Sequence, residues 1–504
     1  MKICIIGAGL AGLTFGALAA RDGHEVTVIE KNSVPGGVAA LVEQDGFQFE
    51  QGQLILADIL PGETLSEFLK TLGIELEAQR DFRGLATPDF ELWCPDEYAG
   101  PCWRREKLRE LFPEDAAGID EYYRFYDALM HIRYLSLQKQ TPFIKLRTAL
   151  TFLKIIKYKD LSSEEFTRRL FKSEKLRLVF TGILADFCAD ASEVQCYTLP
   201  FVNIETAFDS RIPTEKNGKA SYYTGFACFR GGMQKLPEAL AECILSHGGT
   251  ILYDTVAERV LIEDGHVTGV RLTDGRELSA DFVTGCGSAK DFFENAVGLE
   301  NLDEKYREIL KNYRPMEAVL MVHLGVDFDP LRYQKAATCY YYGSYDLHAA
   351  TERLRTGVYH EGRDGLLITV PSAHAPEFAP EGCSCVTIYT VCPDTLINES
   401  WSECGEKYAD QLITLAEKHL PGLREHIVTK KIMTAEDFRE MTHMRKCSFG
   451  GVVPVSGLQN PTHKTPVKGL YFLGQQSENA GGVSAVVFGA RDAYRQFCAE
   501  EMKG

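Results

Sequence analysis

The sequence has no uncharged apolar run approaching the roughly 18 residues that a membrane-spanning helix requires, so an integral membrane protein is not expected. It also has no C-x-x-C pair and no H-E-x-x-H motif, and Cys383 and Cys385 lack a matching second pair, so no metal site is expected. Basic residues are comparatively few: 54 lysines and arginines against 71 aspartates and glutamates give a net charge of −17. Nothing would displace the counterions of a nucleic acid, so nucleic acid binding is not expected.

The remaining composition is that of an ordinary globular protein, with 45% hydrophobic and 25% charged residues among 504. A chain of this length predicts two or more domains. The 15 cysteines are scattered and odd in number, which is typical of thiols used as small apolar side chains in a reducing compartment. We therefore expect a cytoplasmic protein.

Residues 1–30, MKICIIGAGLAGLTFGALAARDGHEVTVIE, fit two interpretations. A lysine, an apolar run and Ala17-Leu18-Ala19 before a charged pair have the layout of a secretory leader. Alternatively, a buried strand from Ile3 to Ile6 leads into a glycine turn and a helix from about Leu10 to Arg21. The alternating stretch from Glu25 to Ile29 favours the second interpretation, because strand, turn, helix and strand together form the βαβ dinucleotide-binding fingerprint.

Each residue of the fingerprint has a physical role. Gly7 permits the tight turn, Gly9 removes a side chain where a pyrophosphate approaches the backbone, and Gly12 allows helix and strand to pack closely. The amides at the helix N-terminus would hold the pyrophosphate. Glu30, at the end of the second strand, would accept hydrogen bonds from both hydroxyls of an adenosine ribose, which disfavours a 2′-phosphate there.

Three further stretches carry related signals. Residues 32–52 contain a second glycine turn, Pro35-Gly36-Gly37, just after the ribose-binding strand. Residues 229–286 predict a helix, a strand and two hairpin turns. Residues 468–491 predict a buried strand from Leu470 to Leu473, a glycine-rich turn and a helix.

The four stretches, in this order and spacing, resemble the flavoprotein family of phytoene desaturases, carotenoid isomerases and retinol saturases, and more distantly the amine oxidases. The resemblance implies an α/β fold with a Rossmann-like, glutathione-reductase-like FAD-binding domain and an inserted α+β substrate domain that contains an antiparallel sheet. It implies FAD as cofactor, and an oxidoreductase that desaturates, saturates or isomerises a small hydrophobic polyene or isoprenoid by hydride transfer at flavin N5. An amine oxidase, and a flavoprotein that uses FAD structurally or as a redox sensor, are the alternatives.

The resemblance also implies which positions contact FAD. The pyrophosphate would lie on the two glycine turns, the adenine beside the backbone of Ala257, the ribityl chain near Gly474, and the flavin pyrimidine at the start of the last helix. The full set is Gly7, Gly9, Ala11, Gly12, Glu30, Lys31, Gly36, Gly37, Ala257, Gly474, Gln475, Gly482, Val483 and Ala485. A helix N-terminus at the pyrimidine would stabilise the negative charge of a reduced flavin by up to about 2 kcal/mol.

Two positions depart from the pattern of the family. Val38 stands where relatives often have a basic residue, and Gln475 where they usually have an acidic one. The loss of a cation at Val38 and of an anion at Gln475 either compensate each other or weaken flavin binding. No second complete fingerprint occurs, since the stretch at Gly285 has only half of one, so a tightly bound nicotinamide is not expected.

Three separated stretches would build the FAD domain: residues 1–70, 225–290 and 436–504. The substrate domain would then comprise residues 71–224 and 291–435. Within it, the stretches from Glu317, Gly365 and Ser384 alternate with period two, which predicts an antiparallel sheet over the flavin. Helical patterns over residues 106–190 and 401–420 would wall a deep apolar cavity.

Residues 142–159, PFIKLRTALTFLKIIKYK, depart from the acidic trend of the chain. Leu146, Ala149, Leu150, Leu153 and Ile156 fall on one helical face, with the basic residues off it. Such a helix either lies on the inner face of a membrane, where a lipid-soluble substrate enters, or packs on its own domain.

Two sets of side chains are weaker candidates for the site. Aromatic residues could line a polyene tunnel, with packing in the protein core as the preferred alternative: Tyr222, Tyr223, Phe226, Tyr340, Tyr341, Tyr342 and Tyr345. His443, Lys446 and Glu478 lie near the cofactor motifs in sequence and could move protons, with surface or structural roles as the alternative. The sequence assigns no catalytic residue and no oligomeric state.

Overall fold

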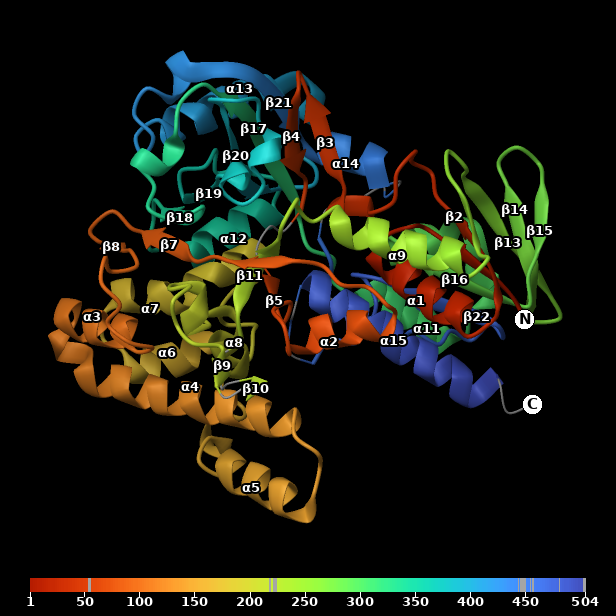
Figure 1. Ribbon diagram of the computed structural model, residues 1–504, viewed down its shortest axis with the longest axis horizontal. Coiled ribbons are helices and arrows are strands. Elements are labelled where there is room, and N and C mark those ends of the chain that lie inside the picture. The colour runs from red at the N-terminus through yellow and green to blue at the C-terminus, as the bar shows by residue number, and fades with distance from the viewer. Residues whose placement is uncertain are drawn as a thin grey trace.

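A parallel five-stranded sheet lies at the centre of the part of the molecule that carries both termini (Figure 1). The computed structural model describes residues 1–52, 56–216, 219–220, 224–442, 444, 450–453, 455, 457–479 and 481–501. In spatial order the sheet contains β12 (Thr250–Leu252), β2 (Glu25–Ile29), β1 (Lys2–Ile6), β16 (Phe282–Cys286) and β22 (Leu470–Leu473). Every neighbouring pair is parallel, so segments far apart in the sequence end together at one edge of the sheet.

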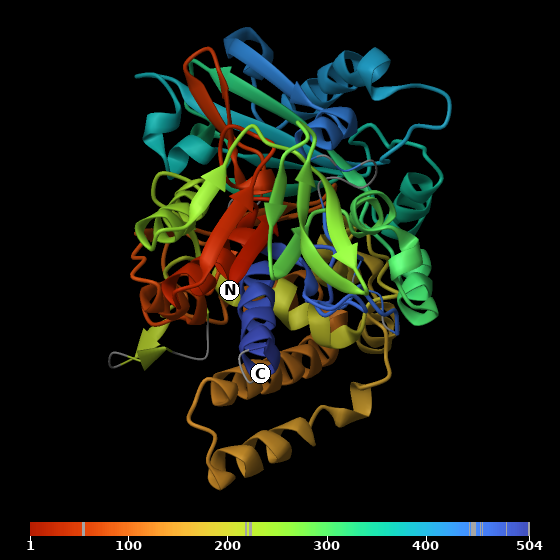
Figure 2. The ribbon, with the colours of Figure 1, turned by 90° about the vertical axis from the view of Figure 1, so that its right-hand side faces the viewer.

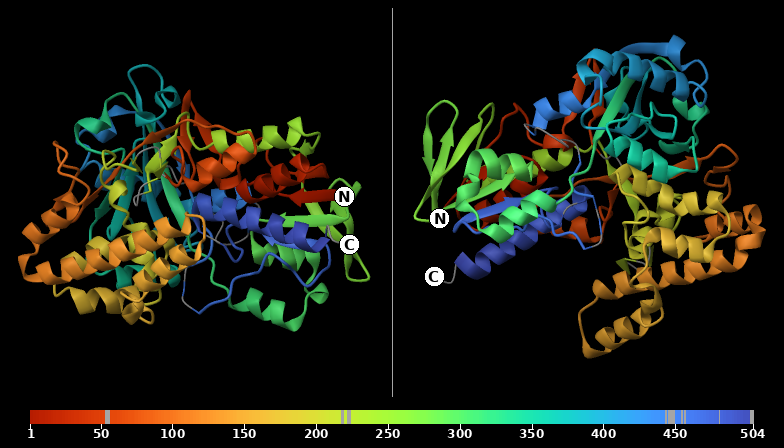
Figure 3. Two further views of the ribbon diagram at one scale, coloured as in Figure 1. Left: turned by 60° about the horizontal axis from the view of Figure 1, so that its bottom comes forward. Right: turned by 180° about the vertical axis from the view of Figure 1, so that it is seen from behind.

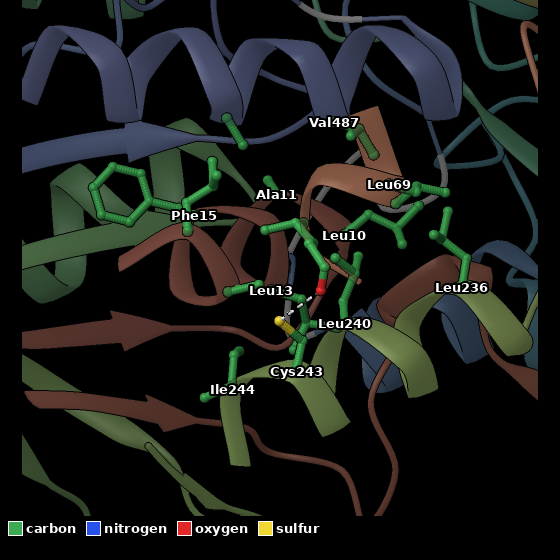
Figure 4. Packing of buried hydrophobic residues seen from close by; sticks show 14 of the residues in the cluster. Leu10, Ala11, Leu13, Phe15, Leu69, Leu236, Leu240, Cys243, Ile244 and Val487 are labelled. Atoms are coloured by element: carbon green, nitrogen blue, oxygen red, sulfur yellow. Dashed lines mark hydrogen bonds between the residues drawn. The ribbon is translucent and has the colours of Figure 1, made fainter. Parts of the chain in front are cut away.

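Helices cover one face of this sheet: α1 (Leu10–Arg21), α2 (Thr64–Thr71), α9 (Lys235–Ser246) and α15 (Gly482–Glu501). Figure 4 shows Leu13 and Phe15 of α1 packed among side chains of α9 and α15. Strand β1 is buried on both faces, with Ile3 and Ile5 in this helical layer and Cys4 in the opposite one. A continuous apolar strand of this kind is typical of a parallel sheet covered on both sides.

The opposite face is covered by a three-stranded antiparallel sheet and short helices. The strands are β13 (Ala257–Glu263), β14 (His266–Leu272) and β15 (Glu277–Ser279), and the helices include α10 (Ala289–Asp291) and α11 (Glu304–Asn312). Both hairpin turns predicted in residues 229–286 are present, as are the predicted strands and helices around the opening turn and after residue 468.

A second large sheet, of seven strands, lies above the first in Figure 1. In spatial order it contains β21 (Ile427–Met433), β17 (Ala318–Val326), β20 (Ser384–Cys392), β19 (Gly365–Thr369), β18 (Thr338–Tyr342), β7 (Arg83–Ala86) and β8 (Glu91–Leu92). The three strands predicted there pair antiparallel, which confirms that expectation, while β18 and β7 pair parallel. Helix α13 (Trp401–Ala416) packs against one face, and α12 (Leu347–Arg355) and α14 (Ala435–Thr442) lie nearby.

A helical layer packs below this sheet and around an aromatic core. It comprises α3 (Trp103–Leu111), α4 (Ala116–Ser136), α5 (Pro142–Phe152), α6 (Ser163–Leu170), α7 (Glu174–Thr181) and α8 (Leu199–Val202). Helix α5 is the outermost element of the layer and stands away from the body of the molecule in Figure 2 and in the right view of Figure 3. Short strands complete the fold: β3 (Leu41–Gln44) with β4 (Phe47–Glu50), β5 (Leu56–Ala57) and β6 (Ala78–Arg80) beside β11 (Phe226–Phe229), and β9 (Glu215–Lys216) with β10 (Lys219–Ala220).

Gly12 sets the distance between α1 and the sheet. A Cβ atom at this position would lie 2.2 Å from the carbonyl oxygen of Gly7 and 3.0 Å from Cγ2 of Ile5. The first contact involves backbone, which cannot rotate away. Helix and turn would therefore have to separate to admit any side chain.

We expect Gly12→Ala to lower the free energy of unfolding of the cofactor-free protein by about 1–3 kcal/mol, the usual cost of overpacking. Gly16→Ala is the matched control in the same helix, because the nearest atoms to its Cβ would be side-chain carbons of Ile5 and Ile244, whose ends can move. Urea denaturation of both variants measures the difference, and equal stabilities would contradict this account of Gly12.

Candidate functional site

A cavity of about 1210 Å³ runs from the glycine turns to the underside of the seven-stranded sheet. Pockets for a single small ligand are typically about 300–1,000 Å³. The cavity therefore has room for a dinucleotide and for a second molecule beside it. Its lining residues come from both large sheets and from the helical layer.

The predicted glycine turns converge at one end of this cavity. The Cβ position of Gly37 lies 3.6 Å from the Cα of Gly9, and the Cβ position of Gly474 lies 3.9 Å from the Cβ of Ala11. The amide of Gly36 donates a 2.8 Å hydrogen bond to the carbonyl of Ala8. Gly36 has a φ of +132°, which a residue with a side chain rarely adopts, so the second turn needs glycine to lie against the first.

Two helix N-termini face this end of the cavity. Gly9, Leu10 and Ala11 at the start of α1 line it, as do Gly482 and Val483 at the start of α15. The two helices run side by side in the same direction, since the hydroxyl of Tyr494 donates a 2.8 Å hydrogen bond to Asp22 near their far ends. Their dipoles add at the cavity and favour an anion there, and no side chain caps α1.

Glu30 marks the other side of the same end. One carboxylate oxygen accepts the amide of Ala8 at 2.7 Å, and the other accepts the backbone and side-chain nitrogens of Asn32 at 2.8 and 2.9 Å. The carboxylate is thereby fixed at the cavity wall, and its oxygens keep further lone pairs for a ligand. The amide of Thr255 bonds to the carbonyl of Glu30 at 2.9 Å, which brings the start of β13, with Ala257, beside it.

Most of the positions that the sequence predicted lie on this wall. Twelve of the fourteen line the cavity: Gly7, Gly9, Ala11, Glu30, Lys31, Gly36, Gly37, Ala257, Gly474, Gln475, Gly482 and Val483. Gly12 and Ala485 do not line it. Gly12 lies between α1 and β1, in the packing role that the sequence suggested for it, and Ala485 lies one turn into α15. Val38 also lines the cavity.

The far part of the cavity is roofed by one face of the seven-stranded sheet. Every second side chain of a strand points to this face, and paired side chains on neighbouring strands form two rows across it. Tyr340, Leu367, Tyr389 and Met321 face each other in one row, and Thr338, Thr369 and Thr387 in the next. Ile183, Phe201, Val202, Ile204 and Phe226 form much of the opposite wall. This part is apolar with a few hydroxyl groups, unlike the end near Glu30.

One acidic side chain lies in this apolar part. Asp186 lines the cavity beside Arg83 and Tyr340, and the hydroxyl of Tyr340 donates a hydrogen bond to it. Removal from bulk water raises the pKa of Asp186 to about 7, although Tyr340 and Arg83 oppose the rise. The guanidinium of Arg83 is held by the carbonyl of Val202 and lies 5.3 Å from the centroid of the Tyr340 ring.

A second buried carboxyl group reaches the cavity from β4. Glu50 accepts the amide of Met233 at 2.7 Å, while its other oxygen has no hydrogen-bond partner in the described part of the chain. Burial raises the pKa of Glu50 to about 8, so the group is largely protonated at neutral pH and can donate a hydrogen bond. Sequence reasoning missed Glu50, Arg83 and Asp186; a lone acid in the apolar run GILADFCA was the available signal.

The aromatic residues named from sequence separate in the structure. Tyr340 and Phe226 line the cavity, whereas Tyr341 is buried against His419 and Tyr342 stacks on Tyr340 without reaching the lining. Tyr345 donates a 2.7 Å hydrogen bond to Asp89 instead. Tyr222 and Tyr223 lie outside the described residues.

Of the three residues suggested for proton movement, one, Glu478, lies in the described part of the chain. Glu478 accepts a hydrogen bond from the amide of His463 at 2.8 Å and does not line the cavity. Its role is therefore the structural one that was the alternative to proton transfer. His443 and Lys446 lie outside the described residues.

Residues 10–288 match the family model for flavin-containing amine oxidoreductases, which is more than half of the chain. The chain belongs to this family. Its cofactor is therefore FAD, and it is an FAD-dependent oxidoreductase, as the sequence predicted. The residues present fit the cofactor: Gly9 opens space at the N-terminus of α1, because a Cβ there would meet no protein atom within 4 Å.

Relatives of the chain are named as a prolycopene isomerase and a phytoene desaturase. Prolycopene isomerase 1 of an Oncidium hybrid cultivar is 24% identical over 503 residues, covering 96% of this chain and 81% of that protein. The lycopene-forming phytoene desaturase of Pseudescherichia vulneris is 22% identical over 514 residues, covering 97% of each. This resemblance to desaturases and isomerases confirms the one drawn from the motifs.

Solved structures share the fold. An oxidoreductase from Methanosarcina mazei has a TM-score of 0.64 at 18% identity, and the match covers 98% of this chain and 100% of that protein. A putrescine oxidase bound to putrescine has a TM-score of 0.61 at 13% identity and covers 99% of this chain and 100% of its own. The fold is thus that of the flavin amine oxidases, with mixed α and β content.

We expect Gly9→Val to lower FAD affinity by more than about tenfold, since the new side chain would occupy the space that the pyrophosphate needs and a tenfold change costs only about 1.4 kcal/mol. The φ of Gly9 is −74°, which valine tolerates, so the stability of the cofactor-free protein should not change. Titration of the apoprotein with FAD, followed by flavin fluorescence, measures the affinity. An unchanged affinity would exclude this turn as the phosphate site.

We expect Asp186→Asn to remove a pH dependence of stability. The pKa of Asp186 is raised above its unfolded value, so its stabilising contribution is complete below about pH 4 and is lost as the pH rises through about 7. Between pH 5 and 8, wild type should lose on the order of 1 kcal/mol relative to the variant, since water in the cavity reduces the full effect of 1.36 kcal/mol per unit. Urea unfolding of both apoproteins at the two pH values tests this, and parallel pH profiles would refute it.

Proposed function

We propose that the protein is an FAD-dependent oxidoreductase of a hydrophobic polyene or isoprenoid, which it desaturates, saturates or isomerises. The observation that carries the proposal is the continuity of the cavity. Its polar end has two helix N-termini and Glu30, and its other end is roofed by the row of Tyr340, Leu367 and Tyr389. A dinucleotide suits the first end and an extended apolar chain suits the second.

The names of the relatives favour the same substrate class. Prolycopene isomerase and phytoene desaturase are named for long conjugated or isoprenoid hydrocarbons. Such molecules offer few groups for hydrogen bonding, so they are held by burial of apolar surface, at about 25 cal/mol per Å². The sheet face and the wall around Ile183 and Phe226 provide that surface.

When bound, FAD supplies the acceptor or donor of a hydride. Desaturation also removes a proton from the neighbouring carbon, and saturation adds one, so this chain must hold a proton inside the cavity. Asp186 suits that task, because a pKa near 7 lets the carboxyl group exchange a proton at neutral pH. Arg83 and Tyr340 would hold it in position, and the surrounding apolar side chains would exclude water.

We also propose the division of the chain into two domains. The glutathione-reductase-like FAD domain would consist of residues 1–70, 225–290 and 436–504, with residues 71–224 and 291–435 inserted as the substrate domain. In favour of this division, every strand of the five-stranded sheet comes from the first set of residues and every strand of the seven-stranded sheet from the second.

An amine oxidase is the second candidate, favoured by the fold shared with the putrescine oxidase. It would place an amine near the flavin and pass electrons to oxygen, forming peroxide. Arg83 lies beside Asp186 in the cavity, and a cation there disfavours binding of a substrate ammonium group. We therefore rank this function below the first.

The proposal is tested with the purified holoprotein under anaerobic conditions. Oxidised protein mixed with a panel of isoprenoid polyenes should lose its visible flavin absorbance, or dithionite-reduced protein should convert or isomerise a polyene detected by chromatography. Peroxide release from amines, with no response to any polyene in either redox state, would contradict the proposal and favour an amine oxidase. A flavin that responds to neither class would favour a structural or sensing role.

Leu367→Gln should raise KM for a polyene by roughly tenfold while FAD content stays at the wild-type level, because it places an amide in the middle of the apolar row. Leu366→Gln is no suitable control, since Leu366 is buried in the core on the other face of the sheet. Val428→Gln on the exposed edge strand β21 serves instead. An unchanged KM would show that substrate does not lie along this face.

A further inference from the structure

Helix α5 presents apolar side chains to solvent. Phe143, Leu146, Leu150 and Leu153 are 65%, 57%, 54% and 61% exposed. They recur at intervals of three and four residues, so they lie on one face of the helix. The face predicted from Leu146, Ala149, Leu150, Leu153 and Ile156 is thus turned outward, while the helix packs on α4 through its other side.

The inward face of α5 is the more polar one. Ile144, Thr148, Thr151 and Ile155 are the buried or half-buried positions of the segment. The hydroxyls of Thr148 and Thr151 donate hydrogen bonds to carbonyls of the preceding turn, those of Ile144 and Arg147, at 2.9 and 2.8 Å. Helix α5 packs on α4 with Thr151 and Ile155 buried and Ile144 and Thr148 half-buried, while the larger apolar side chains point away from the protein. This arrangement is the reverse of a surface helix in a soluble domain.

The charge of this region differs from that of the rest of the protein. No aspartate or glutamate occurs between Asp127 and Asp160 in a chain of net charge −17. Basic residues in that interval are Arg133, Lys139, Lys145, Arg147, Lys154, Lys157 and Lys159. At 100° per residue, Lys145 lies on one side of the exposed apolar face and Arg147 on the other. Within the described part of the chain, Lys145 and Lys154 form no ion pair.

We propose that α5 and the turn after it, residues 142–156, dock on the surface of an anionic phospholipid bilayer. The apolar side chains would enter the boundary between headgroups and acyl chains, and the flanking cations would contact lipid phosphates. No described helix is long and apolar enough to cross a membrane, so the contact is interfacial. A second copy of the chain is a poorer occupant, because it would bring the same cations face to face.

The docking surface is connected to the cavity through α4. Helix α4 packs against α5 on one side and against α8 on the other, and Phe201 and Val202 of α8 line the cavity. Phe201 is also 44% exposed. Given the proposed function, on which this step alone rests, a lipid-soluble substrate would pass from the bilayer past α8 without crossing water.

The experiment is flotation of the holoprotein with vesicles on a sucrose gradient, without substrate. Wild type should float with phosphatidylcholine vesicles that contain about one third phosphatidylglycerol, and much less with phosphatidylcholine alone. The double variant Leu150→Glu and Leu153→Glu should lose at least about tenfold in partitioning. Lys145→Gln with Lys154→Gln should lose about 30-fold on the anionic vesicles, at about 1 kcal/mol per charge.

The matched control is Ile397→Glu with Val428→Glu, because these side chains are 65% and 56% exposed elsewhere on the molecule. It should float as wild type does. Equal flotation of the α5 variants and wild type overturns the proposal, and so does a wild-type dimer in light scattering that Leu150→Glu and Leu153→Glu convert to monomer. FAD content and flavin reactivity, measured on the same samples, report on the proposed function independently.

Discussion

The structure depends on the close approach of α1 to β1 at the opening turn. Only because Gly12 has no side chain can the amides at the start of α1 lie at the end of the parallel sheet, where β16 and β22 also end. Helix α15 then reaches the same place from the far end of the sequence. The N-termini of both helices line one end of the cavity, so the positive ends of two helix dipoles favour negative charge on a ligand there.

Polarity changes along the cavity in a way that serves its two occupants. Near Glu30 the wall consists of glycines, amides and a fixed carboxylate, which make directional contacts. Below the seven-stranded sheet it consists of side chains that alternate along β18, β19 and β20, which offer surface with little direction. Asp186 and Glu50 are acidic groups in the low-polarity surroundings, and their raised pKa values follow from that position.

Local patterns predicted most of the residues that line the cavity around the glycine turns and Glu30. The stretch from Lys2 to Glu30 specifies strand, turn, helix and strand by itself, and twelve of the fourteen predicted positions line the cavity. The substrate end could not be derived in the same way. Arg83 and Tyr340 become neighbours through the parallel pairing of β7 with β18, and Asp186 joins them from the helical layer. A short sequence motif cannot predict contacts between residues as far apart in the sequence as Arg83, Asp186 and Tyr340.

Helix α5 shows a different limit of periodicity. The sequence identified which apolar side chains share a face, since that follows from 3.6 residues per turn. It could not determine whether the face points to α4 or away from it, because Thr148 and Thr151 are also acceptable against a neighbouring helix once their hydroxyls bond to the backbone. The direction of the face is a property of tertiary packing alone.

The order of strands in the parallel sheet has a consequence for synthesis on the ribosome. Strand β16 ends at Cys286, but its outer neighbour β22 begins only at Leu470. While the residues between them are translated, β16 is an open edge of an apolar sheet, the kind of surface that pairs with other chains. The apolar edge of β16 therefore stays uncovered until β22 is made, and the cavity wall is completed only when Gly474 and the start of α15 follow.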